Sequence, residues 1–115
     1  MTTLDTRLAG DAEAPRSNIK ALVVGFPKSG TSTITLALRK SGWKAIHWYD
    51  RQARDFIGRV MYRRLYEGVD PLIDFAQYDA ITQADAITAR ESFWPQFDPG
   101  MMRSIRQHHP ECTFV

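Results

Sequence analysis

Lys28 and the hydroxyl residues that follow it are the groups of this chain best suited to binding a phosphate. They lie in the stretch Gly25–Thr33, which reads GFPKSGTST. Lys28 supplies a positive charge, and Thr31, Ser32 and Thr33 supply hydrogen-bond donors. An apolar run precedes the stretch and a helical pattern follows it, so the loop presents unpaired backbone amides and a helix N-terminus at one point. The pattern therefore predicts a phosphate cradle.

His47 is the first candidate for a general base. It lies near the end of a predicted strand, and the carboxyl ends of strands line the ligand crevice in open α/β sheets. Its ordinary pKa also suits proton transfer near neutral pH. Asp50 and Glu91 are weaker candidates. The alternative is that His47 is structural and packs between Trp43 and Trp48.

The elements that must position these groups form a strand–helix–strand pattern. Ala21–Val24 is a continuous apolar run, typical of a strand that is buried on both faces of a parallel sheet. Trp43–Trp48 is the second expected strand, and such a unit has a right-handed crossover. The helix between them is expected over Thr31–Lys40. Its apolar face comprises Ile34, Ala37 and Leu38.

Further helices and strands are expected along the rest of the chain. We expect Asp50 to cap a long helix that ends near Glu67, and Asp98 to cap a helix whose first residue is proline. Tyr78–Thr82 and Cys112–Val115 are the third and fourth expected strands. Residues 1–17 are polar and lack a period, so we expect a flexible leader there. Residues 18–115 are then one α/β domain, with a parallel sheet flanked by helices.

Length and composition exclude several classes of protein. The 115 residues suffice for one domain, and 43% hydrophobic residues suffice for a core. A net charge of +2 without a basic stripe argues against nucleic-acid binding. The single cysteine, Cys112, excludes an intrachain disulfide. No apolar run approaches the roughly 20 residues of a membrane helix, and no secretory signal is visible, so a cytoplasmic protein is expected.

The loop differs from a Walker A motif. That motif places a lysine directly after its second glycine. Here Gly25 and Gly30 have the required separation, but Thr31 occupies the lysine position and Lys28 lies two residues before Gly30. A P-loop nucleotide kinase or NTPase, which would need magnesium, remains an alternative interpretation.

The segment Gly25–Thr31 closely resembles the 5′-phosphosulfate-binding loop of the sulfotransferases. In that family PKSGT or PKTGT follows a hydrophobic strand and opens a helix. Looser similarities extend along the chain and resemble a bacterial-type branch: they include Ser41-Gly42-Trp43, Tyr78–Thr82 and the pair Phe93-Trp94. The resemblance implies a P-loop-like α/β fold that uses 3′-phosphoadenosine 5′-phosphosulfate (PAPS) as co-substrate, without a metal.

The resemblance also implies roles for individual residues. The sulfuryl group would pass to a hydroxyl or amine of a small-molecule, carbohydrate or lipid acceptor. Lys28 would stabilise the charge that develops on the bridging oxygen of the leaving group, and His47 would accept the proton of the acceptor. The residues implied to hold the 5′-phosphosulfate are Pro27, Lys28, Ser29, Gly30, Thr31, Ser32 and Thr33.

Sulfotransferases are about twice as long as this chain or longer, as expected for a complete doubly wound domain. In the family an arginine and a serine that follow the strand near Thr113 hold the 3′-phosphate, and this chain lacks those positions. We therefore expect an N-terminal portion, truncated after about four strands, with impaired or absent catalysis. An open sheet edge would favour self-association. A non-catalytic binding module is the third interpretation.

Overall fold

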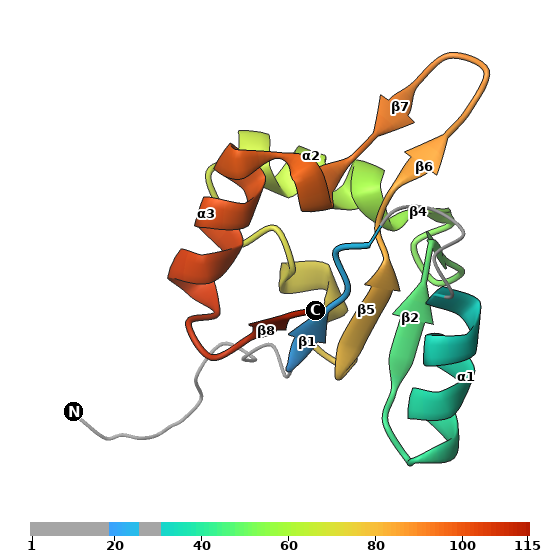
Figure 1. Ribbon diagram of the computed structural model, residues 1–115. Coiled ribbons are helices and arrows are strands. Elements are labelled where there is room, and N and C mark those ends of the chain that lie inside the picture. The colour runs from blue at the N-terminus through green and yellow to red at the C-terminus, as the bar shows by residue number, and fades with distance from the viewer. Residues whose placement is uncertain (1–18, 26–30) are drawn as a thin grey trace.

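Four short parallel strands form the sheet on which the rest of the chain is assembled (Figure 1). The computed structural model describes residues 19–25 and 31–115. The four strands are β1 (Ala21–Leu22), β2 (Ala45–His47), β5 (Ala80–Gln83) and β8 (Thr113–Phe114). Along the sheet their order is β2-β5-β1-β8, so β1 lies inside it. Each strand overlaps one expected from the sequence, although β1, β2 and β8 are shorter than expected and β5 ends one residue later. The α/β class with a parallel sheet is confirmed.

Helices flank this sheet, and two small antiparallel ribbons extend from it. The α-helices are α1 (Thr31–Lys40), α2 (Ile57–Tyr66) and α3 (Pro99–His108), and the 3-10 helices are η1 (Ile73–Phe75) and η2 (Pro95–Phe97). One ribbon comprises β3 (Tyr49–Asp50) and β4 (Asp55–Phe56), and the other comprises β6 (Ala86–Ile87) and β7 (Ser92–Phe93). None of the helices in the described part of the chain is long and apolar enough to span a membrane.

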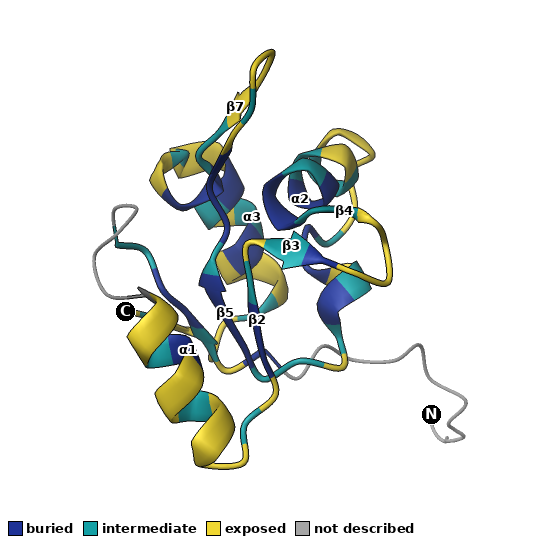
Figure 2. Ribbon diagram, turned by 90° about the vertical axis from the view of Figure 1, so that its right-hand side faces the viewer, coloured by how far each residue is buried: buried dark blue, intermediate teal, exposed yellow. Residues whose placement is uncertain are grey.

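The two faces of the sheet differ in chemistry, because side chains alternate along each strand. Leu22, Ile46 and Ile81 belong to the main core cluster, to which α2, α3 and η1 also contribute apolar side chains. On the other face the hydroxyl of Thr82 meets Thr35 of α1. No α1 residue whose side chain is described belongs to the core cluster. Helix α1 is mostly exposed, whereas α2 and α3 bury one side each (Figure 2).

The predicted apolar face of α1 is partly wrong. Ile34 and Leu38 are half-buried as expected, but Ala37 is exposed. The buried inward position is Thr35, which is only 4% exposed. The helix therefore contacts the sheet through a buried hydroxyl as well as through apolar side chains.

The long helix expected to begin at Asp50 is also wrong. Asp50 lies in β3, is buried, and accepts a hydrogen bond from the N–H of Gln52 at 3.0 Å. The chain then turns back as β4, and α2 begins only at Ile57. Asp50 therefore stabilises a turn and caps no helix.

Helix α3 begins as the sequence predicts. The Asp98 carboxylate accepts hydrogen bonds from the N–H groups of Gly100 and Met101, and Pro99 is the first helical residue. Tyr62 of α2 donates its hydroxyl proton to the same carboxylate at 2.7 Å. This hydroxyl bond lowers the pKa of Asp98, although burial opposes the effect. The cap therefore also joins α2 to α3.

Candidate functional site

The predicted phosphate cradle falls between two described elements. Gly25, after the end of β1, is the last described residue before it, and α1 begins directly after it. Pro27, Lys28, Ser29 and Gly30 lie outside the described residues, as does the predicted leader 1–17. Thr31 opens α1, although its side chain is not described. Ser32 and Thr33 follow in the first turn and are exposed. The described elements thus place the carboxyl end of a central strand and a helix N-terminus on either side of the loop.

His47 lies at the carboxyl end of β2 and contacts two buried hydroxyl groups. Its Nδ1 is 3.0 Å from Thr82 Oγ1 and 3.2 Å from Thr35 Oγ1. The two hydroxyl oxygens are 2.5 Å apart. Thr82 comes from β5, and Thr35 lies one turn after the start of α1. The cluster therefore ties His47 to the helix that follows the predicted cradle.

The hydrogen-bond geometry indicates which nitrogen of His47 carries the proton. Thr82 donates its hydroxyl proton to the carbonyl oxygen of Ile46 at 3.2 Å. The proton of Thr35 then satisfies the short contact between the hydroxyls. With the two hydroxyl protons placed in this way, neutral His47 donates from Nδ1 to the threonine oxygens. Its Nε2 then carries a lone pair and has no hydrogen-bond partner among the described residues, as a general base requires.

The surroundings of His47 favour its neutral form. Burial lowers the pKa of His47 below its ordinary value of 6.5, and the nearby Arg39 guanidinium lowers it further, against the opposing charge of Asp85. Arg39 is held in place by two hydrogen bonds, at 3.0 and 3.1 Å, to the carbonyl oxygen of Ala45. Neutral imidazole is the form that accepts a proton.

We expect Arg39→Gln to raise the pKa of His47, because the substitution removes a neighbouring positive charge. NMR titration of the His47 ring measures this value. Lys40→Gln, at the exposed neighbouring position, is the control and should leave it unchanged.

The lowered pKa of His47 also predicts how stability depends on pH. Because the folded pKa lies below 6.5, the unfolded chain binds the proton first, and the wild-type protein should lose stability as the pH falls through 6.5 towards the folded pKa. A His47 pKa at or above 6.5 would contradict the expectation.

Trp48 presents an aromatic ring at the same edge of the sheet. Its φ is +73°, a conformation that costs a non-glycine residue about 1–2 kcal/mol. Its N–H donates to the carbonyl oxygen of Gln83 at 2.8 Å, and its carbonyl oxygen accepts from Ile57 N–H at 3.0 Å. The ring packs edge-on against Phe56 with centroids 5.2 Å apart, yet 43% of the residue is exposed. The fold therefore holds a strained, partly exposed indole beside His47.

A buried carboxylate follows β5, the strand that neighbours β1. Asp85 is 3% exposed and accepts hydrogen bonds from two side-chain amides: Gln96 Nε2 at 2.6 Å and Gln83 Nε2 at 3.2 Å. Gln96 Nε2 also lies 3.5 Å from the carbonyl oxygen of Gly25, next to the predicted cradle. No cation among the described residues forms an ion pair with Asp85. This pair was not predicted from the sequence, although Asp85 lies only three residues after the end of the predicted strand Tyr78–Thr82.

The same amide leaves one buried oxygen unsatisfied. Gln96 is 5% exposed, and its Oε1 accepts no hydrogen bond within the described part of the chain. Rotating the amide by 180° does not help, because an oxygen would then face the Asp85 carboxylate. An unsatisfied buried acceptor costs about 1–3 kcal/mol. The site therefore presents two acceptor groups, the Asp85 carboxylate and the Gln96 oxygen.

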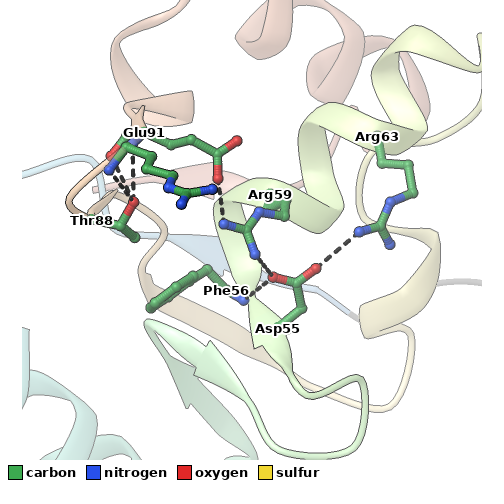
Figure 3. Close-up of polar contacts among 7 residues, drawn as sticks. Asp55, Phe56, Arg59, Arg63, Thr88 and Glu91 are labelled. Atoms are coloured by element: carbon green, nitrogen blue, oxygen red, sulfur yellow. Dashed lines mark hydrogen bonds and ion pairs between the residues drawn. The ribbon is translucent and has the colours of Figure 1, made fainter.

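Asp85 and Gln96 flank the β6–β7 hairpin, which projects from the molecule in Figure 1. Arg59 of α2 anchors this hairpin (Figure 3). It donates to Glu91 at 2.5 Å and to Asp55 at 2.8 Å, and Asp55 also pairs with Arg63 at 2.9 Å. Glu91, a weaker candidate for the base, therefore forms an ion pair with Arg59 in this structure.

A scan against protein-family models gave no match, and searches of curated proteins and of solved structures gave none either. The described residues also contain no group of three or more histidine, cysteine, aspartate or glutamate side chains placed to hold a metal ion. The functional assignment therefore rests on the chemistry of the residues around the carboxyl edge of the sheet.

Proposed function

We propose that this chain is the 5′-phosphosulfate-binding part of a PAPS-dependent sulfotransferase with a P-loop-like fold. The observation that carries the proposal is the sequence PKSGT between β1, a strand inside the parallel sheet, and α1, which begins at Thr31. A loop in that position directs backbone amides and a helix N-terminus towards an anion. The sulfuryl acceptor is a hydroxyl or an amine.

In the proposed reaction the lone pair of the acceptor forms a bond to sulfur. The bond from sulfur to the bridging oxygen breaks, and its electron pair stays on the 5′-phosphate. Lys28 stabilises that negative charge, and the acceptor proton passes to the free Nε2 of His47. The support for His47 is the Nδ1 anchor on two threonines, which leaves Nε2 available.

We expect the chain to bind 3′-phosphoadenosine 5′-phosphate in isothermal titration calorimetry, and Lys28→Ala to weaken that binding at least tenfold. Loss of a charge-assisted hydrogen bond costs about 1.5–3 kcal/mol, and each 1.4 kcal/mol is a factor of ten. Lys40→Ala, which removes an exposed lysine at the other end of α1, is the matched control and should bind normally.

Three results would contradict the proposal. The first is a wild-type chain that does not bind this nucleotide, and the second is a Lys28→Ala variant that binds it as tightly as wild type does. The third is a Lys40→Ala variant whose nucleotide affinity falls as much as that of Lys28→Ala. Magnesium-dependent binding of ATP in preference to it would favour the nucleotide kinase or NTPase alternative. Self-association without any nucleotide affinity would favour the non-catalytic binding module.

A further inference from the structure

We propose that Asp85 and Gln96 form a subsite that binds a primary ammonium group, so that the sulfuryl acceptor carries such a group in addition to the hydroxyl or amine that is sulfated. The inference rests on the proposed function for its place in a reaction, but the subsite is defined by the two side chains alone. They meet at the carboxyl ends of β5 and β1, beside the carbonyl oxygen of Gly25. The negative charge of Asp85 acts on the His47 ring, where it raises the pKa against the larger effects of burial and Arg39.

The charge of the subsite favours a cation. Asp85 is buried, and both of its hydrogen-bond donors in the described part of the chain are neutral amides. A buried carboxylate without a counter-charge is costly, so a positively charged occupant compensates it better than a neutral one. An ammonium group supplies that charge.

The number of acceptors favours an amine over a hydroxyl. Gln96 Oε1 has no donor among the described residues, and it belongs to the amide that contacts Asp85 Oδ1 at 2.6 Å. The orphan oxygen therefore lies within about 5 Å of the carboxylate, a span that one nitrogen bridges with two ordinary hydrogen bonds. An ammonium has three N–H donors and satisfies both oxygens, whereas a hydroxyl has one proton and satisfies only one.

A divalent metal ion fits the subsite poorly. Calcium takes six to eight oxygen ligands and magnesium takes six, and protein sites for them are usually built around carboxylates. Asp85 is the only carboxylate of the subsite, and the described residues form no cluster of three metal-ligating side chains there. The donor-rich, singly charged amine is therefore the occupant that the chemistry favours.

Access to the subsite requires a small movement of the hairpin. Asp85 directly precedes β6, and Gln96 lies in η2, which follows β7, so their hydrogen bond closes the base of the hairpin. The contact from Gln96 to Gly25, at 3.5 Å, is the weakest in the set. An amine that enters beside Gly25 replaces this contact and gives the orphan oxygen a donor.

Benzylamine and benzyl alcohol are a matched pair of probes for this subsite. We expect the wild-type chain to bind benzylamine at least tenfold more tightly than benzyl alcohol in NMR titrations, with shifts of the Gln96 side-chain amide. Asp85→Asn keeps the shape but removes the charge, and should abolish the preference. Glu111→Gln, at an exposed carboxylate, is the control and should retain it.

Equal binding of the two probes, or an unchanged preference in Asp85→Asn, would overturn the proposal. If Asp85→Asn does not fold, the wild-type spectra decide, because a Gln96 amide that does not shift at saturating benzylamine refutes the subsite. Titrating 3′-phosphoadenosine 5′-phosphate into the same samples separates the two proposals. Nucleotide binding without amine preference refutes only the subsite, and amine preference without nucleotide binding refutes only the proposed function.

Discussion

Gly58→Ala is expected to lower the free energy of unfolding by about 1–2 kcal/mol, although alanine is the better helix former. A Cβ at this position of α2 would lie 2.5 Å from the carbonyl oxygen of Ala84 and 3.0 Å from Phe93 Cβ. The nearest obstacle is backbone, so α2 and the base of the β6–β7 hairpin must separate. Overpacking of this kind costs 1–3 kcal/mol or more, and exceeds the gain of about 1 kcal/mol in helix propensity.

Urea denaturation of Gly58→Ala and Gly100→Ala tests this expectation. Gly100 lies in α3, where a Cβ would meet only Asp98 Oδ1, at 3.4 Å. Gly100→Ala should therefore be as stable as wild type or slightly more stable. Because Ala84 precedes Asp85, Gly58→Ala should also shift the NMR signals of the Asp85–Gln96 pair, whereas Gly100→Ala should not. Equal stability of the two variants would show that the close approach of α2 to the hairpin is unimportant.

The elements with strong local signals could be predicted from the sequence. Ala21–Val24 reads as a buried strand because parallel strands covered on both faces are continuously apolar. Helix α3 could be placed because an aspartate cap followed by proline specifies a helix start. In both cases the physical cause lies within a few residues of the chain, so no tertiary contact has to be known.

The segment after β2 could not be predicted, because tertiary contacts override local preference there. Trp48 and Arg54 both adopt positive φ, which neither residue type favours. The packing of Trp48 against Phe56, together with the β3–β4 pairing, offsets that cost. A helical pattern of apolar residues begins at Ile57, and the sequence alone gave no reason to start the helix seven residues after Asp50.

The Asp85–Gln96 pair was missed for a similar reason. The tetrapeptide Asp-Ala-Ile-Thr occurs at 79–82, where it leads into β5, and again at 85–88, where it forms β6. The same tetrapeptide therefore contributes to a strand of the parallel sheet in one place and to a strand of the antiparallel hairpin in the other. The hairpin turn lacks the Asn-Gly or Asp-Gly signal of tight turns, and instead uses the Thr88 hydroxyl to accept from the N–H groups of Arg90 and Glu91 (Figure 3).

Thr82→Val is the second substitution with a large expected effect, a loss of about 2–3 kcal/mol in the free energy of unfolding. Valine has nearly the shape of threonine, so the change removes a hydroxyl without leaving a cavity. Thr35 then loses an acceptor at 2.5 Å, His47 Nδ1 loses one at 3.0 Å, and the Ile46 carbonyl loses a donor. These groups are buried or partly buried, and stranding such groups costs about 1–3 kcal/mol.

The control for this substitution is Thr113→Val, at an exposed position of β8, which should change stability by less than about 0.5 kcal/mol. Thr35→Val and the double variant complete a thermodynamic cycle. Removing one hydroxyl leaves the other without its partner, whereas the double variant has neither. The loss of unfolding free energy in the double variant should therefore be smaller than the sum of the two single-variant losses. Additive losses, or a Thr82→Val protein as stable as Thr113→Val, would mean that the hydroxyl cluster does not hold His47.

The tautomer of His47 in Thr82→Val is a second test of the cluster. If the cluster does not hold the ring, the ring should keep its Nδ1–H tautomer in this variant. If the cluster does hold the ring, ¹⁵N shifts of His47 should show a larger share of the Nε2–H form, which has no lone pair at the nitrogen proposed to accept the proton.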